Sequence, residues 1–254
     1  MPTCYIVGAG DFTARGFAPG PEDLVLAADG GYRALYRLGT TPDLLLGDFD
    51  SLGDVPLPAN LPVLRFPVRK DDTDTGLALR YGLEQGFRDF ALYGCAGGRV
   101  DHLLANLQSM ARVSRLGASV RLAAPDYDAW ALTGPAAPGP NAAPGPNAPV
   151  PLAPGPNAAP APLAPSPDAP APTAPSPDAP AAVLTLPPRP GGTLVSVFCH
   201  GDRAEGVTLT GLAYPRSDAV LTGDFPLGVS NRRLDGQPAT VAVRRGTLLI
   251  FQSA

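Results

Sequence analysis

The sequence predicts two parts of different fold class: an N-terminal α/β domain built on a parallel sheet, and a C-terminal all-β sandwich domain. Before residue 135, short apolar runs alternate with amphipathic stretches, which is typical of βα units. After residue 183 the apolar residues recur with a period of two, which indicates strands separated by turns. A proline-rich tract separates these patterns, so we expect domains at 1–134 and 183–254, joined by a linker at 135–182.

Six strands are expected in the N-terminal part, each a short apolar run between turn residues. Their ranges are 4–8, 23–29, 43–47, 62–66, 89–94 and 119–124. Because amphipathic stretches separate these runs, we expect the strands to be parallel and covered by helices.

Three amphipathic helices are expected between the strands. The first lies in 29–39; the second begins at an N-cap that is either Asp72 or Thr73 and stops before Gly86; the third lies in 99–117. The side chains expected to share one side are Tyr32, Leu35, Tyr36 and Leu38 in the first helix, and Leu103, Leu107, Met110 and Ser114, with Val100, Leu104 and Ala111 beside them, in the third.

Most of the chain's 33 prolines fall between Pro135 and Pro180. The repeats APGPNA and APSPDAP carry almost no bulky apolar side chains, so packing would not offset the entropy lost on ordering this tract. We therefore expect a disordered, extended linker with polyproline character. A ligand for proline-recognising domains is the less favoured alternative, because basic residues do not flank the tract.

Four strand-forming segments follow the linker, at 193–201, 207–215, 218–230 and 239–252. A unit of about seventy residues buries only a marginal core by itself. We therefore expect the C-terminal part either to dock on the N-terminal part or to dimerise.

Composition and charge exclude several classes of function. The formal net charge of -4 lacks the basic excess of proteins that bind nucleic acid. The three cysteines are far apart, which argues against a disulfide framework or a cysteine-based zinc site and favours a reducing compartment. No apolar run approaches the about 18 residues of a membrane span, and the first residues lack a basic leader, so we expect a soluble cytoplasmic protein.

Aspartates follow four strands that are consecutive in the chain. Asp29 follows the second strand, Asp48 and Asp50 the third, Asp71, Asp72 and Asp74 the fourth, and Asp101 the fifth. One aspartate after a strand is usually a turn or N-cap residue. The carboxyl ends of parallel strands share one edge of the sheet, however, so we expect all of these aspartates to lie at that edge. The set predicts a site for a hard cation such as Mg²⁺. Substrate phosphates commonly complete the coordination shell of this cation.

Basic and polar residues beside these acids are candidates for phosphate contacts. Lys70 precedes the acids after the fourth strand, and Arg99 precedes Asp101. The backbone N–H groups of 8–10 and 97–98 are further candidates, although glycines after strands are often only turn residues. His102 and Asn106 lie about one helical turn apart and can share a face at the same edge; a local hydrogen bond is the alternative role for His102.

Several motifs occur in a fixed order: ADGG at 28–31, GDFDS at 47–51, KDDTD at 70–74, GGRVDHLLANL at 97–107, GLAYP at 211–215 and GVSN at 228–231. In this order they resemble bacterial-type thiamine pyrophosphokinase, over nearly the whole chain outside the linker. The resemblance implies an α/β domain and a β-sandwich domain in a homodimer with active sites at the subunit interface. It also implies Mg²⁺-dependent transfer of pyrophosphate from ATP to thiamine, giving thiamine diphosphate and AMP.

The resemblance also implies roles for individual residues. Asp48, Asp50 and either Asp72 or Asp74 would hold Mg²⁺ and the triphosphate, and Asp29 and Asp101 would support that shell. The other residues expected at the ATP site are Lys70, Arg99, His102 and Asn106, and Tyr214, Ser230 and Asn231 would hold thiamine. We expect one aspartate to accept the hydroxyl proton of thiamine, with Asp72 and Asp74 as the candidates.

One departure from the family pattern keeps two other functions open. The family turn usually continues as SNE, whereas this chain reads SNRR at 230–233, which places Arg232 where an acid is expected near a cationic acceptor. A non-catalytic sensor of thiamine or nucleotide is therefore one alternative. A metal-dependent nucleotide-sugar transferase is the other, since Asp48 and Asp50 form a DxD pair, but it leaves the remaining motifs unexplained.

Overall fold

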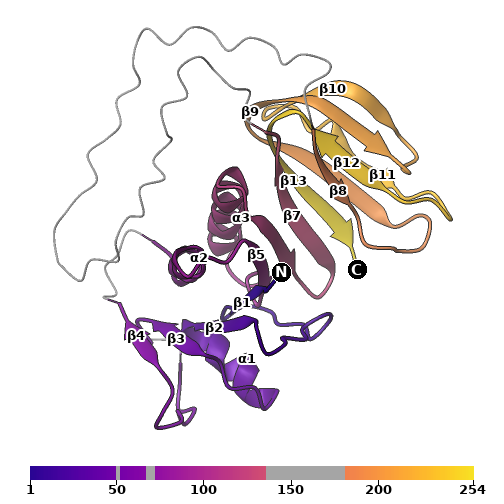
Figure 1. Ribbon diagram of the computed structural model, residues 1–254. Helices are drawn as coiled ribbons and strands as arrows, with labels where there is room; N and C mark the ends of the chain where they lie inside the picture. The colour runs from indigo at the N-terminus through magenta and orange to yellow at the C-terminus, as the bar shows by residue number, and fades with distance from the viewer. Residues whose placement is uncertain (50–51, 67–71, 136–180) are drawn as a thin grey trace, which may run out of the picture.

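The computed structural model describes residues 1–49, 52–66, 72–135 and 181–254 (Figure 1). Nearly all of the predicted linker lies outside the described residues, and so do Asp50 and Lys70. Within the described part of the chain, no helix is long and apolar enough to cross a membrane.

A parallel sheet forms the N-terminal part of the protein, as predicted. Its strands are β1 (Cys4–Val7), β2 (Leu24–Ala28), β3 (Leu44–Gly47), β4 (Val63–Arg65), β5 (Asp89–Tyr93) and β6 (Ser119–Ala123). They lie in the order β4-β3-β2-β1-β5-β6, and every adjacent pair is parallel. The chain therefore passes from β1 to β2 on one side of β1, and later returns to place β5 on the other side of β1.

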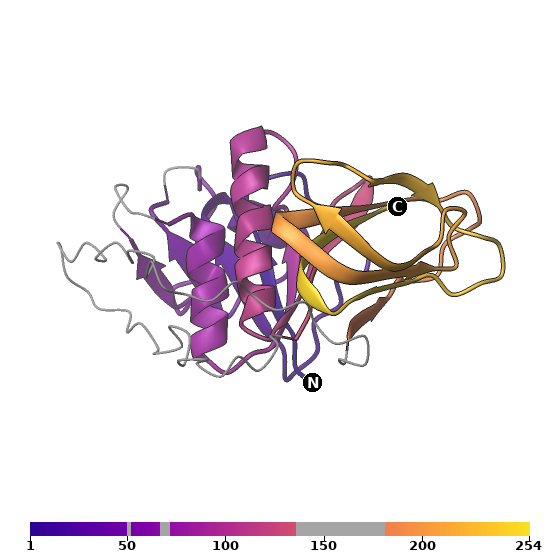
Figure 2. The ribbon, with the colours of Figure 1, turned by 90° about the horizontal axis from the view of Figure 1, so that it is seen from above.

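Helices cover both faces of this sheet (Figure 1), and Figure 2 looks onto the face that two of the helices cover. The short helices η1 (Asp29–Gly31) and α1 (Tyr32–Arg37) lie on one face, while α2 (Asp74–Glu84) and α3 (Val100–Arg115) lie on the other. Alternate residues of each strand serve the two cores: Ile6 packs with α2 and α3, and Val7 packs with α1. This alternation is the period of two that a sheet buried on both faces requires.

The predicted apolar faces of two helices are partly wrong. Tyr32 and Leu35 of α1 are buried, but Tyr36 is 51% exposed and Leu38, which follows the helix, is 43% exposed, because a helix of six residues presents a single turn to the sheet. In α3, the residues buried against the sheet begin at Asn106. The earlier residues Val100 and Leu104, which we expected to be covered, are 70% and 57% exposed.

The C-terminal part is rich in strands, as predicted, and forms two layers. Its strands are β8 (Ala182–Thr185), β9 (Leu194–Thr210), β10 (Arg216–Thr222), β11 (Gly228–Arg232), β12 (Thr240–Val243) and β13 (Arg245–Ser253). The first half of β9 pairs with β13 and β11, and its second half pairs with β10 and β12. We expected separate strands at 193–201 and 207–215; instead Gly201 and Gly206, both with positive φ, redirect one long strand without ending it.

A strand that was not predicted, β7 (Tyr127–Thr133), joins the two parts. It pairs antiparallel with β6 on one side and with β13 on the other, so one sheet runs through both parts. Trp130 of β7 packs in the C-terminal core, and Leu249 of β13 packs in the N-terminal core. The domain division at 1–134 and 183–254 stays a prediction from sequence.

A buried carboxylate lies at this joint. Asp128 of β7 accepts a hydrogen bond from Arg15 Nη1 at 2.5 Å, and Arg189, from the loop after β8, approaches the same oxygen at 3.3 Å. Arg121 of β6 lies 3.5 Å from the other oxygen. Three separate segments are therefore held around one side chain that is only 4% exposed.

Candidate functional site

Three of the predicted aspartates come together at the carboxyl edge of the parallel sheet. Asp29 follows β2, Asp48 follows β3 and Asp74 begins α2, and one carboxylate oxygen of each lies within 4.8 Å of the others. Asp29 is buried and the other two are half-buried. Carboxylates this close repel one another, and a hard cation between them removes the repulsion. The donor set of this acidic triad therefore fits a divalent cation.

Glycines in the adjoining turns let the chain bring these aspartates together. A Cβ atom at Gly31 would lie 1.8 Å from the Val7 carbonyl oxygen, so only glycine fits where η1 crosses the end of β1. Gly47 has φ of +146°, and a Cβ there would lie 3.0 Å from Asp29 Cβ. Asp29 and Phe49 have φ of 48° and 69°, which is unfavourable for residues with a side chain. Such strain is typical of functional sites.

The start of α2 decides which aspartate joins the triad. Thr73 is the N-cap residue, because its hydroxyl accepts a hydrogen bond from Gly76 N at 3.0 Å. Asp74 then occupies the first helical position, where the helix dipole favours a carboxylate. Asp72 lies outside the helix, accepts from Thr73 N at 2.9 Å and forms a 3.7 Å ion pair with Arg80. The triad therefore contains Asp74 and not Asp72.

The predicted residues after β5 lie apart from the triad. Arg99 donates two hydrogen bonds to Asp101, and both side chains are mostly exposed. This hydrogen bonding lowers the pKa of Asp101 below its usual value and raises that of Arg99. The strands β2 to β5, after which the predicted acids lie, are consecutive in the chain. In the sheet, however, β1 lies between β2 and β5, and this separates Asp101 from Asp29.

His102 and Asn106 occupy different environments at the start of α3. His102 is exposed, whereas Asn106 is buried and donates from Nδ2 to the Cys95 carbonyl oxygen at 2.8 Å. The Asn106 amide therefore ties α3 to the loop after β5. The expected contacts of both residues with ATP stay predictions, as do those of Asp50 and Lys70, which lie outside the described residues.

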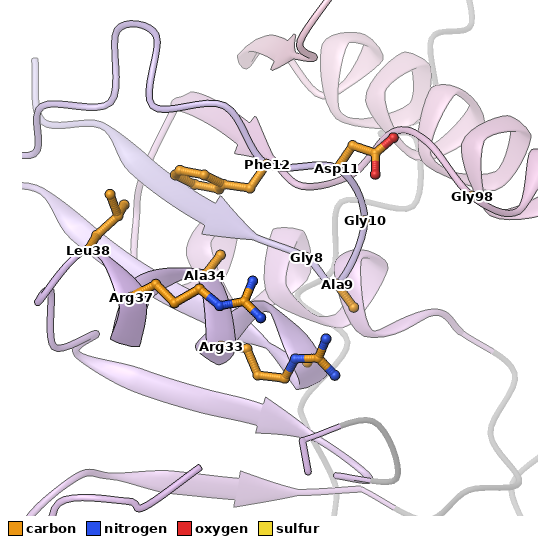
Figure 3. A pocket seen from close by; sticks show the side chains of 11 residues that line it. Gly8, Ala9, Gly10, Asp11, Phe12, Arg33, Ala34, Arg37, Leu38 and Gly98 are labelled. Carbon is orange, nitrogen blue, oxygen red and sulfur yellow. The ribbon is translucent and has the colours of Figure 1, made fainter. Parts of the chain in front are cut away.

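A pocket of about 510 Å³ lies beside the triad (Figure 3). Its lining includes Gly30, which directly follows Asp29, together with Phe12, Arg33 and Arg37. Gly30 belongs to the ADGG motif, but we did not single out Phe12, Arg33 or Arg37 from the sequence. Asp11, which also lines the pocket, follows β1 just as the predicted acids follow their strands, so the same rule would have found it. The pair Arg33 and Arg37 is signalled by its spacing of four on the helix after Asp29.

The backbone N–H groups expected to contact phosphate are already used at two positions. Gly8 N donates to the Tyr93 carbonyl oxygen at 2.8 Å, and Gly10 N donates to the Gly94 carbonyl oxygen at 2.7 Å. A Cβ at Gly10 would lie 2.3 Å from the Ala96 carbonyl oxygen. These two glycines therefore allow close packing of the loops after β1 and β5, and the expectation of phosphate contacts through their N–H groups was wrong.

The residues expected to hold thiamine lie together in the C-terminal part. The buried amide of Asn231 hydrogen bonds to the backbone of Tyr214, whose side chain is 65% exposed. Ser230 has φ of 58° and donates from its backbone N–H to Ser196 Oγ. Arg232, the departure from the family pattern, donates from Nη1 to the Gly192 carbonyl oxygen at 3.1 Å.

The fold and the triad define a two-part protein whose α/β part presents a carboxylate site suited to a divalent cation. Residues 21–122 match the family "Thiamin pyrophosphokinase, catalytic domain", and residues 183–248 match "Thiamin pyrophosphokinase, vitamin B1 binding domain". The chain belongs to the thiamin pyrophosphokinase family.

Individual relatives agree with this assignment. The chain is 32% identical over 103 residues to the thiamine pyrophosphokinase of Bacillus subtilis. The aligned residues cover 39% of this chain and 48% of that protein. It thus matches about half the length of that curated relative.

Solved structures of the family share the fold. The crystal structure of the Bacillus subtilis thiamine pyrophosphokinase has a TM-score of 0.71 at 20% identity and covers 99% of both chains. That of Geobacillus thermodenitrificans has a TM-score of 0.67 at 20% identity, covering 99% of this chain and 97% of the other. The yeast thiamin pyrophosphokinase has a TM-score of 0.60 at 11% identity, covering 100% of this chain and 86% of the yeast chain.

Proposed function

We propose that the protein is a thiamine pyrophosphokinase that transfers pyrophosphate from ATP to thiamine with Mg²⁺, giving thiamine diphosphate and AMP. The observation that carries the proposal is the acidic triad, because transfer of a highly charged group needs a site that binds and neutralises phosphate. The matches to both a catalytic and a vitamin-binding domain support the choice of acceptor.

The triad residues Asp29, Asp48 and Asp74 would hold Mg²⁺, with Asp50 as a further candidate from the sequence. When bound, the cation would supply charge neutralisation for the phosphate oxygens of ATP. Oxygen donors without histidine or cysteine are the ligands that Mg²⁺ prefers.

The reaction forms one bond and breaks one. The hydroxyethyl oxygen of thiamine bonds to the β-phosphorus of ATP, and the bond from that phosphorus to the oxygen bridging to the α-phosphorus breaks. AMP leaves with the bridging oxygen. The hydroxyl proton passes to a carboxylate, for which Asp72 and Asp74 are the candidates. The chain's contribution is mainly to position the two substrates.

We infer that the functional unit is a homodimer. In the sheet, β11, with Ser230 and Asn231, is seven strand spacings of about 4.8 Å from β2, so the path along the sheet between the proposed thiamine and metal residues of one chain is roughly 30 Å. Thiamine cannot span that separation. A second copy can bring its Tyr214 to the triad, and exposed apolar side chains occur on both parts, including Leu104 and Phe225.

The test is AMP formation from ATP and Mg²⁺ by the purified protein, with and without thiamine. We expect AMP release that depends on thiamine, matched by thiamine diphosphate, and lost when the divalent cation is chelated. Binding of both substrates without AMP release would overturn the proposal and favour the sensor. Release of AMP with no thiamine diphosphate formed would show a different acceptor.

A further inference from the structure

Phe49 directly follows a residue of the acidic triad, and its backbone conformation is unfavourable. Asp48, the residue before it, contributes one of the three clustered carboxylates. Phe49 has φ of 69°, in the left-handed region that residues with a side chain rarely occupy. Such a conformation persists only where the surrounding structure holds it. The contacts of the Phe49 ring therefore help to decide where the Asp48 carboxylate lies.

The Phe49 ring is anchored first by apolar packing. It is half-buried and packs against the core on the α1 face of the sheet. The buried members of that core include Leu45 of β3 and Leu35 of α1. The turn after β3 is thus tied to the same face that α1 covers.

The guanidinium group of Arg65 makes a second contact with this ring. Arg65 is the last residue of the edge strand β4, and it pairs with Gly47 at the end of β3 (Figure 1). The backbone N–H of Phe66 donates to the Gly47 carbonyl oxygen at 2.9 Å, which fixes the two strands at this point. Arg65 Cζ lies over the Phe49 ring, 4.7 Å from its centroid, which is within the range of a cation–π interaction.

On the basis of the proposed function, we propose that Arg65 is a positioning residue for the metal site. Its guanidinium group holds the Phe49 ring in place, and the ring holds the Phe49 backbone in the left-handed conformation. That conformation directs the Asp48 carboxylate toward those of Asp29 and Asp74. In this role Arg65 acts through Phe49 and needs no contact with the cation or with a substrate.

A direct electrostatic effect of Arg65 would have the opposite sign. A positive charge near a cluster of carboxylates repels a divalent cation, so removing that charge should strengthen cation binding. Removing a group that positions Asp48 should weaken cation binding, although it also removes a positive charge. The direction of the change therefore separates positioning from simple charge.

The test is binding of Mn²⁺ to the full-length protein without nucleotide, followed by the electron paramagnetic resonance of free Mn²⁺. This ion suits the same oxygen ligands as Mg²⁺. Arg65→Gln should raise the Kd for Mn²⁺ about threefold, as expected for loss of a cation–π contact at an exposed site. Arg65→Lys keeps a cation and should recover part of this loss. The control is Arg112→Gln, on the exposed side of α3, which should bind Mn²⁺ as the wild type does.

A second pair of variants tests whether the effect passes through the ring. Phe49→Leu keeps an apolar side chain but removes the aromatic face, so it should also weaken Mn²⁺ binding. In the Phe49→Leu background, Arg65→Gln should cause no further loss, because the guanidinium group no longer has a ring to cover. The melting temperature of Arg65→Gln should equal that of the wild type, because Arg65 is exposed.

Unchanged or tighter Mn²⁺ binding in Arg65→Gln overturns the inference, and so does a wild-type protein that binds no Mn²⁺. A further threefold loss in the Phe49→Leu background overturns the route through the ring. A fall in melting temperature that Arg65→Lys does not restore shows general destabilisation and also overturns the inference. The expected Mn²⁺ shifts support it even if thiamine-dependent AMP release is absent, in which case only the proposed reaction fails.

Discussion

The side chain of Asn231 hydrogen bonds to both backbone groups of Tyr214. Its Oδ1 accepts from Tyr214 N at 2.9 Å, and its Nδ2 donates to the Tyr214 carbonyl oxygen at 2.8 Å. The same Oδ1 also accepts from Arg232 N at 2.9 Å. The amide is buried and engaged within the protein at both ends, so we infer that Asn231 positions the exposed Tyr214 ring and does not itself contact thiamine.

Replacing Asn231 with alanine should therefore affect both stability and acceptor binding. Loss of hydrogen bonds to a buried amide costs about 1–3 kcal/mol, so the melting temperature should fall, and the KM for thiamine should rise at least tenfold. Tyr214→Ala, which removes the ring but keeps its backbone, should raise the KM for thiamine without lowering the melting temperature. Steady-state kinetics and thermal melts check both; a wild-type thiamine KM in Asn231→Ala contradicts the positioning role.

The two aspartates at the start of α2 should differ sharply when each is replaced by asparagine. Asp74→Asn removes a charge from the triad and should lower kcat by about a hundredfold or more. Asp72→Asn breaks the ion pair with Arg80 and should cost much less, because Asp72 lies outside the triad. Glu84→Gln, exposed at the end of the same helix, is the matched control. The reverse order of effects would show that Asp72, as metal ligand or as acceptor of the hydroxyl proton, contributes more than Asp74.

Asp128 should be the residue most costly to remove at the joint between the two parts. Its replacement by alanine leaves three arginines facing one another, and breaking a buried ion pair costs about 3–5 kcal/mol. The arginines are 26–31% exposed and can recover some hydration, so we expect the low end of that range. Denaturant unfolding of Asp128→Ala against Asp126→Ala, an exposed neighbour, measures it. Equal stability of the two variants would show that Asp128 does not hold the parts together.

The parallel sheet and much of the acidic site could be predicted because they depend on local patterns. The apolar runs marked β1 to β6, and parallel strands necessarily bring the residues after them to one edge, where Asp29, Asp48 and Asp74 meet. The N-cap could not be chosen from residue type alone, since both Asp72 and Thr73 cap helices well. Only the geometry of the turn, with Thr73 as the cap, directs Asp74 into the triad.

The remaining differences depend on contacts between residues that are distant in the chain. The strand β7 exists because β6 and β13 flank it, and β13 lies more than a hundred residues later. The exposure of Leu104 depends on how far α3 extends past the strands it covers, which the helical period does not fix. Likewise, the N–H groups of Gly8 and Gly10 donate to the last residue of β5 and to the loop after it, and the sequence does not identify these neighbours.

A mixture of two inactive chains should recover activity if the site is shared between subunits. Asp48→Asn inactivates the triad, and Tyr214→Ala leaves the proposed acceptor site nearly inactive when the assay uses thiamine well below the raised KM. In a mixed dimer, the intact triad of one chain meets the intact Tyr214 of its partner, so one of the two sites works. Co-refolding equal amounts should therefore give about one quarter of wild-type activity, since about half of the dimers are mixed.

The control mixture is Asp48→Asn with Asp74→Asn. Both changes damage the triad, so every mixed dimer has two inactive triads and no activity returns. Light scattering coupled to size exclusion confirms that each variant is dimeric before mixing. Recovery in the first mixture alone means that the triad of one chain and Tyr214 of the other form one site. If neither mixture recovers while both variants form mixed dimers, each chain uses its own residues, and the roughly 30 Å separation along the sheet must close by a movement of the C-terminal part.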